Sequence, residues 1–213
     1  TARDRKKDQT YFLYRLPQTI LKQTTFPLGN FTKDQVKKIA SRELAKMDFH
    51  QRPESQDLCF LPDKQSKTFL LPTQGPGPIK NCQHQTIGIH EGISHYTIGQ
   101  RHGLNVSSKT GPLYITALEP RNNTVYVGQK NDVFFSQIWL NKTIIKPLLI
   151  RFDFYSAKLR SQSQPANCQV RSINKKILLD FDQPQFAPTK GQHAVVYHKN
   201  LVVGGGEIYT YSN

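Results

Sequence analysis

The hydrophobic period of the chain changes near residue 68, and this change constrains the fold more than any other feature. Beyond it, the helical spacing gives way to short apolar runs separated by turn residues such as Asn122-Asn123 and Asn174-Lys175. The runs that we predict as strands are residues 68–71, 86–90, 95–98, 113–118, 124–127, 137–140, 147–154, 168–173, 176–181, 194–197 and 201–208. Many short strands with frequent turns favour small β-barrels over a parallel sheet with crossover helices.

The first 66 residues are predicted to be helical. Thr32 and Gln35 have the spacing of a capping box, and Asp8 is expected to cap a shorter helix that ends near Pro17. After the capping box, apolar residues at helical spacing predict one buried stripe, made of Val36, Ile39, Ala40, Leu44 and Met47.

These patterns predict a mainly β protein with an N-terminal helical segment. We expect a helical region over residues 1–66, a small central β domain over residues 67–132 and a C-terminal β-barrel over residues 133–213. Residues 61–83 are rich in proline and glycine, which indicates a linker or an extended edge.

The chain is strongly basic, with 29 Lys and Arg against 15 Asp and Glu and a net charge of +14. This excess points to a polyanion such as nucleic acid, and the alternative is a merely soluble basic protein. Residues 133–178 interleave basic residues with the aromatic Phe152, Phe154 and Tyr155. On a barrel, such a surface suits a phosphate backbone and unpaired bases, while scattered solubilising charge is the alternative.

The three cysteines, Cys59, Cys82 and Cys168, have no metal-ligand spacing, so we expect no zinc site. No apolar run approaches the roughly 20 residues of a membrane span, and the first residues do not form a signal peptide. Free thiols in the cytoplasm are the simplest expectation. Because residue 1 is Thr1 rather than methionine, we treat the chain as part of a longer protein.

Cys59 follows the polar residues 55–57, past the helical stretch and before the proline-rich segment. A thiol at such an edge is accessible to solvent and to a partner, as a reactive thiolate must be. The local sequence also allows a small buried hydrophobe, because free cysteine is among the most buried residue types.

Six strings in order resemble the bacterial tRNA-specific 2-thiouridylases, from about residue 5 to the end. The strings are residues 7–13 (KDQTYFL), 26–29 (FPLG), 55–60 (SQDLCF), 90–104 (HEG and YTIGQRHGL), 191–197 (GQHAVVY) and 204–206 (GGG). The resemblance implies an ATP-pyrophosphatase domain, a central β domain and a C-terminal β-barrel. It also implies that ATP adenylates the wobble uridine and that a cysteine persulfide, loaded by a sulfur-relay protein, supplies sulfur to C2.

The cysteine that matches the persulfide position is Cys59. The family's ATP loop, its other catalytic cysteine and its acid/base aspartate match nothing in residues 1–213, so we expect a fragment without an ATP site that is inactive alone. We also expect a monomer. The resemblance leads us to expect a disulfide bond as well.

The positions that match tRNA contacts in the family are Lys7, Asp8, Gln9, Arg160, Ser161 and Gln192. Lys and Arg suit phosphate, and Gln suits a base or sugar edge. The alternatives are a helix cap for Asp8, a solvated arginine for Arg160 and a turn glutamine for Gln192. The family usually has an aromatic residue where Ser161 stands, which puts base stacking there in doubt.

Other readings stay open. Cys82 and Cys168 match no family motif and are interpreted as structural. His84, His90, His95 and His102 lie close in sequence, and we expect packing or surface roles rather than a metal site. An alternative function of a different class is that of a non-catalytic β-barrel RNA-binding module. A third alternative is a barrel that docks on acidic proteins. A Ser-Gly-Gly-x-Asp-Ser loop upstream would favour the enzyme.

Overall fold

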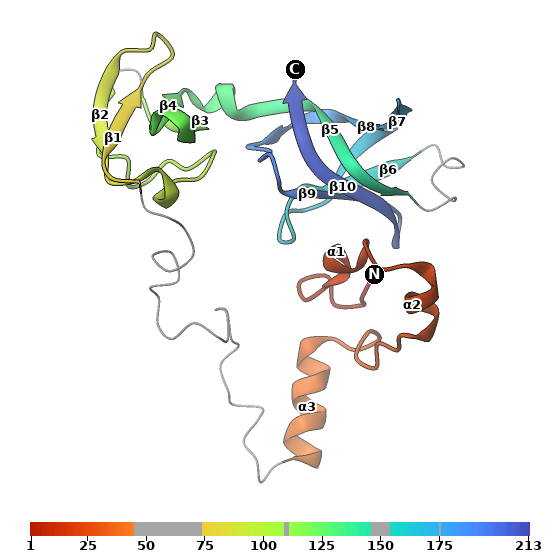
Figure 1. The fold of residues 1–213 in the computed structure, drawn as a ribbon. Coiled ribbons are helices and arrows are strands. Elements are labelled where there is room, and N and C mark those ends of the chain that lie inside the picture. Colours follow the sequence, from red (N-terminus) through yellow and green to blue (C-terminus); the bar gives the residue numbers. More distant parts are fainter. Residues whose placement is uncertain (45–73, 109–110, 146–153, 175) are drawn as a thin grey trace. The chain divides into compact units, whose positions relative to one another are not determined.

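The computed structural model describes residues 1–44, 74–108, 111–145, 154–174 and 176–213 (Figure 1). The chain divides into two compact units. The first comprises residues 1–54, 136–183 and 190–212, and the second comprises residues 55–135 and 184–189 with Asn213. Each unit is therefore built from segments that are far apart in the sequence.

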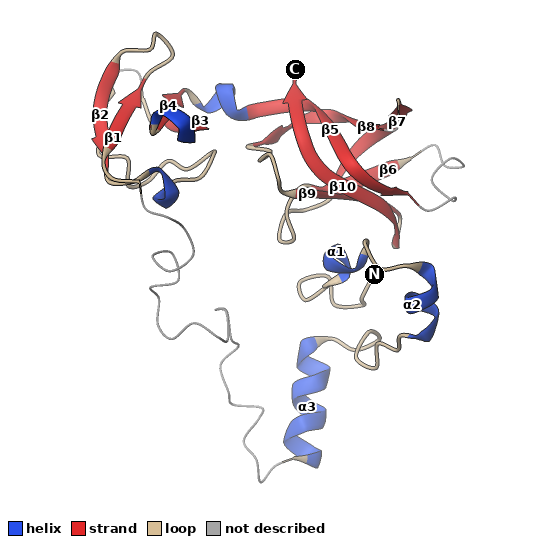
Figure 2. Ribbon diagram, viewed as in Figure 1, coloured by secondary structure: helices blue, strands red, loops and turns tan. Residues whose placement is uncertain are grey.

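The prediction of a mainly β chain with an N-terminal helical segment is confirmed (Figure 2). The helices of the described residues are α1 (Thr10–Leu13), α2 (Gln18–Gln23) and α3 (Lys33–Glu43), with short 3-10 turns η2 (Ile93–His95), η3 (Pro120–Asn122) and η4 (Lys130–Val133). The strands are β1 (Gly77–Lys80), β2 (Thr86–His90), β3 (Tyr114–Glu119), β4 (Thr124–Gly128), β5 (Phe134–Ile145), β6 (Tyr155–Lys158), β7 (Ala166–Ile173), β8 (Lys176–Phe186), β9 (His193–His198) and β10 (Leu201–Ser212).

The strands of the first unit close into a barrel in the order β10-β5-β8-β7-β6-β9, as predicted. Closure pairs every strand on both sides and removes the exposed edges that an open sheet would present. Alternate residues point inward, so Ile138 and Leu140 of β5 are fully buried with Leu179 of β8 and Ile208 of β10. Cys168 lies in the same core.

The N-terminal segment packs on the barrel through Tyr14, which is only 3% exposed and forms a cluster with Val195 and Tyr197 of β9. Glycine in β10 makes this contact possible. A Cβ at Gly205 would lie 2.5 Å from the carbonyl oxygen of Ala194 and 2.9 Å from Cδ2 of Tyr14. Strand β9 and the Tyr14 ring therefore both approach β10 more closely than a side chain would allow.

Helix α3 begins as predicted but does not bury its apolar side. The capping box of Thr32 and Gln35 is present in both directions. The predicted buried stripe is wrong for the described residues: none of α3 is buried, Ile39 is 41% exposed, and Leu44 at its end is also exposed. The helical spacing was read correctly, but no described residue covers the apolar face. Met47 lies outside the described residues.

The second unit contains a four-stranded sheet in the order β2-β1-β4-β3, in which β1 pairs antiparallel with β2 and parallel with β4. Its core contains Ile79, Ile115 and Val125. Strand β1 lies within the segment predicted as a linker or extended edge. It tolerates Pro78, which has no N–H, because its pairing with β4 runs through Ile79 and Lys80.

Most other predicted strands are confirmed with shifted ends, and residues 86–90 match β2. The strand predicted over residues 95–98 is wrong. There the backbone N–H of Thr97 donates to Gln100 Oε1 (3.1 Å) and the N–H of Gln100 donates to the Thr97 carbonyl (3.0 Å), which closes a turn. Strand β6 was not predicted as a separate element, and residues 68–71 and 147–153 lie outside the described residues.

The close approach at Gly205 is testable. We expect Gly205→Ala to lower the free energy of unfolding by ~1–3 kcal/mol, because the new methyl group must displace β9 or Tyr14. Urea unfolding followed by the fluorescence of Trp139, the single tryptophan, measures this. The matched control is Gly75→Ala, whose Cβ meets nothing within 4 Å. Equal stability of the two variants would contradict the packing described above.

Candidate nucleic-acid interface

An open groove of about 470 Å³ lies in the first unit. Three segments line it: Tyr11 from α1, residues 160–162 between β6 and β7, and residues 191–193 at the start of β9. Arg160, Ser161 and Gln192, which sequence analysis predicted as separate contacts, therefore share one site. Arg160 contributes a guanidinium to the lining, which includes no carboxylate, so the local charge suits an anion.

A tight turn presents residues 160–162. The backbone N–H of Ser163 and its hydroxyl both donate to the Arg160 carbonyl, at 3.1 and 2.8 Å, and the Arg160 N–H donates back to the same hydroxyl (3.3 Å). Ser161 and Gln162 are the two central residues of this turn. Their side chains therefore project from a backbone that Ser163 holds in place.

The backbone before β9 is also held. The N–H of Gly191 donates to the Ile208 carbonyl (3.0 Å), and the N–H of Ile208 donates to the Gln192 carbonyl (2.7 Å). Gly191 has a φ of +83°, a conformation that favours glycine. The Gln192 Oε1 atom is buried, and no donor among the described residues reaches it. Gln192 therefore lines the groove with other atoms of the residue, while this oxygen is closed off from solvent.

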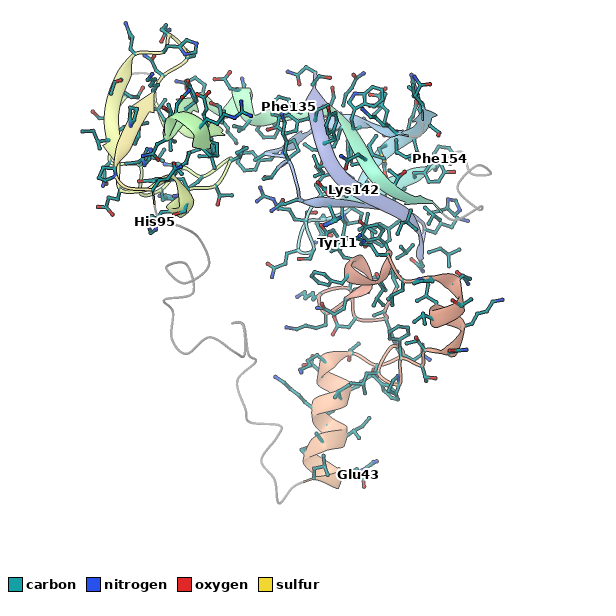
Figure 3. All side chains as sticks on the ribbon, viewed as in Figure 1. Tyr11, Glu43, His95, Phe135, Lys142 and Phe154 are labelled. Carbon is teal, nitrogen blue, oxygen red and sulfur yellow. The ribbon has the colours of Figure 1, made fainter. Side chains whose placement is uncertain are left out.

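Two tyrosines bind the N-terminal segment to His193. Tyr11, which is labelled in Figure 3, lies on α1. The Tyr11 hydroxyl donates to the His193 carbonyl (2.7 Å), and the Tyr14 hydroxyl is hydrogen-bonded to His193 Nδ1 (2.7 Å). Burial raises the pKa of Tyr11 to about 12, so the phenol stays protonated at neutral pH and keeps its donor. The groove therefore exists because α1 is fixed to the end of β9.

The segment before α1 supplies Lys7, Asp8 and Gln9. The Asp8 carboxylate accepts from the backbone N–H of Ala2 (3.3 Å) and from the N–H and hydroxyl of Thr10 (3.1 and 2.9 Å). Asp8 thus bonds to Thr10, the first residue of α1, but the N-cap position expected for Asp8 is held by Gln9, and its side chain makes no capping hydrogen bond. Lys7 and Gln9 are exposed on either side of it.

Asp4 connects this segment to α3. Its carboxylate accepts from the backbone N–H of Lys33 (2.9 Å) and of Lys6 (3.1 Å). The bond from Lys33, the first residue of α3, is the main cause that lowers the pKa of Asp4. The turn that carries Lys7 is thus held by a carboxylate that stays ionised at neutral pH.

The cysteines differ in their surroundings. Cys59 lies outside the described residues. Cys168 is buried, and burial raises its pKa to about 12, with Asp182 and Asp180 adding to the shift. It is a packed thiol. Cys82 is exposed in the turn after β1. The interpretation of both cysteines as structural stays a prediction. Both described thiols are free.

The histidines of the second unit do not gather around a common point. His90 is fully buried, its Nε2 is hydrogen-bonded to the Asn123 carbonyl (2.9 Å), and His84 lies edge-on to Tyr126. Among the described residues, no three His, Cys, Asp or Glu side chains are grouped so as to hold a metal ion.

Sequence reasoning missed Tyr11, Gln162 and His193 as groove residues. Tyr11 and His193 lie inside two of the quoted strings, but nothing in either string indicates that the two segments meet. Gln162 lies in none of them, so only the turn geometry identifies it.

Comparison with known proteins gives the family. Three domain models match in order: a tRNA methyl transferase HUP domain (residues 1–63), a tRNA methyl transferase PRC-barrel domain (68–129) and an aminomethyltransferase β-barrel domain (140–208). The chain is 37% identical to the tRNA-specific 2-thiouridylase MnmA of Halothermothrix orenii and 39% identical to MnmA 1 of Caldanaerobacter subterraneus, over 97% and 96% of its length. The chain belongs to the tRNA-specific 2-thiouridylase family.

The chain spans 59% and 57% of the length of these two relatives. A third relative, MnmA of a Synechococcus strain, is 38% identical over 96% of the chain and 56% of its own length. No helix in the described part of the chain has the length and apolar character to cross a membrane.

Proposed function

We propose that this chain is the tRNA-binding and sulfur-carrying part of an ATP-dependent tRNA 2-thiouridylase, which transfers persulfide sulfur to C2 of the wobble uridine. The observation that supports this most is the groove, because Arg160, Ser161 and Gln192 all line it. These are positions that match tRNA contacts in the family. The curated relatives are named as tRNA thiouridylases, which supports the reaction.

The groove chemistry suits RNA. Arg160 offers a guanidinium for a phosphate, and the amides of Gln162 and Gln192 can pair with a base or sugar edge. In the segment before α1, we propose that the exposed Lys7 and Gln9 contact tRNA directly. Asp8 is committed to Ala2 and Thr10, so we propose that it acts by holding this segment in shape.

Cys59 is the proposed sulfur carrier. A sulfur-relay protein would load it as a persulfide. The terminal sulfur would bond to C2 of the adenylated uridine as AMP leaves, and a second thiol would then break the sulfur–sulfur bond by forming a disulfide with Cys59. Both transfers occur at sulfur, so they need a thiolate that partners can approach. Cys168 cannot take this role, because it is buried and its pKa is raised to about 12.

ATP does not fit the described residues. Its phosphates need a loop with free backbone N–H groups, usually ahead of a helix. The glycines at 204–206 instead lie inside β10, between β5 and β9. We therefore assign no ATP step to these residues and propose that residues 1–213 alone show no turnover. We further propose a monomer acting in the cytoplasm, with domains at residues 1–66, 67–132 and 133–213.

The groove's part in binding predicts a salt effect. We expect Arg160→Ala to weaken tRNA binding by roughly 10- to 150-fold, because a hydrogen bond to a charged group contributes ~1.5–3 kcal/mol. The slope of log K against log salt concentration should fall by about one, as for one lost phosphate contact. Filter binding of the full-length protein at several salt concentrations measures both quantities.

The control for this experiment is Arg42→Ala on α3. Arg42 is exposed, forms an ion pair with Glu43 (2.7 Å) and lies outside the groove lining. An unchanged slope for Arg160→Ala, or an equal loss for both variants, would argue against the groove as a phosphate contact.

The sulfur-carrier role predicts that Cys59→Ser in the full-length protein abolishes 2-thiouridine formation and leaves the Kd for tRNA within about threefold. Nucleoside mass spectrometry and filter binding measure the two effects. Cys82→Ser, which removes an exposed thiol of the second unit, should leave both unchanged. Undiminished thiolation by Cys59→Ser would remove the proposed carrier. Binding without thiolation by the wild-type protein would favour a non-catalytic RNA-binding module.

A further inference from the structure

The groove contains an aromatic ring that none of the predicted contacts includes. Tyr11 forms one wall, facing the turn that carries Arg160 and Ser161. Ser161 offers no ring. Tyr11 comes from a part of the chain about 150 residues away, so an element distant in sequence supplies an aromatic surface to the groove.

The Tyr11 ring is held in one orientation. Its hydroxyl donates to the His193 carbonyl (2.7 Å), and its edge or face meets Phe12 at 5.3 Å between ring centroids with an 82° interplanar angle. It is half-buried, so part of the ring remains open to the groove. A fixed ring loses little conformational entropy when a planar ligand stacks on it.

The size and polar groups of the groove suit one nucleotide. A volume of about 470 Å³ falls within the ~300–1,000 Å³ of small-ligand sites. Gln192 also lines the groove, and its side-chain amide is the kind of polar group that pairs with a base edge. Arg160 lies on the same groove and provides a cation for the phosphate.

We propose that Tyr11 is a base-stacking residue and that the groove holds a single unstacked nucleotide of the tRNA. The base lies on the Tyr11 ring, the side-chain amide of Gln192 bonds to its edge, and Arg160 contacts its phosphate. This inference rests on the proposed tRNA binding and adds a residue and a mode of recognition to it.

Variants at Tyr11 separate stacking from the hydroxyl contact with His193. Stacking contributes ~1–3 kcal/mol per base, so Tyr11→Leu in the full-length protein should weaken tRNA binding by roughly 5- to 150-fold. Tyr11→Phe keeps the ring and should stay within about threefold of the wild type. The control is Tyr209→Leu, which removes a tyrosine ring that is 50% exposed and lies outside the groove lining.

A second measurement does not depend on how well the variants fold. Wild-type protein is irradiated with tRNA in which uridines are replaced by 5-iodouridine, which crosslinks to a stacked aromatic ring. Mass spectrometry of the crosslinked peptides should identify Tyr11. Crosslinks that all map elsewhere, or equal losses of affinity for Tyr11→Phe and Tyr11→Leu, would overturn the stacking role. If the wild-type protein does not bind tRNA at all, the proposed function itself fails.

Discussion

The contact between two tyrosines and His193 is the interaction on which the groove depends. Tyr11 binds the carbonyl of this residue and Tyr14 binds its ring, so one position at the start of β9 fixes both ends of α1. Without this contact, the turn of residues 160–163 and the backbone of residues 191–193 would remain, because each is held by its own hydrogen bonds. The groove would lose its aromatic wall.

Tyr14 provides most of the energy of this contact. The helices α1, α2 and α3 contain no buried residues, so the N-terminal segment has little core of its own. Tyr14 follows α1 and is buried against Val195 and Tyr197. Burying an apolar side chain of similar size contributes ~1.5–3 kcal/mol, and a hydrogen bond adds ~1 kcal/mol. Gly205 permits this packing because it leaves room for the ring.

Local patterns predicted those parts of the fold that local interactions determine. The capping box of Thr32 and Gln35 and the closed barrel follow from spacing and alternation, and both are found. Strand β1 falls in the proline- and glycine-rich segment predicted as a linker or extended edge, and its Pro78 is paired with Ile89 of β2 but with no residue of β4. The prediction of a buried stripe on α3 was wrong, because the hydrophobic period of a helix shows which of its sides is apolar but not whether another element covers that side.

The candidate site shows the same limit. The resemblance identified Arg160, Ser161 and Gln192 one by one, but their meeting with Tyr11 depends on how α1 packs on β9.

The most direct test of this account is native-state hydrogen exchange of Tyr14→Ala. The Phe12 and Leu16 amides, which are hydrogen-bonded within the segment, should exchange at least ~10-fold faster, as for a loss of ~1.4 kcal/mol. Amides of the barrel strand β9 should keep their protection. Unchanged exchange at Phe12 and Leu16 would contradict the account, as would an equal acceleration throughout the barrel.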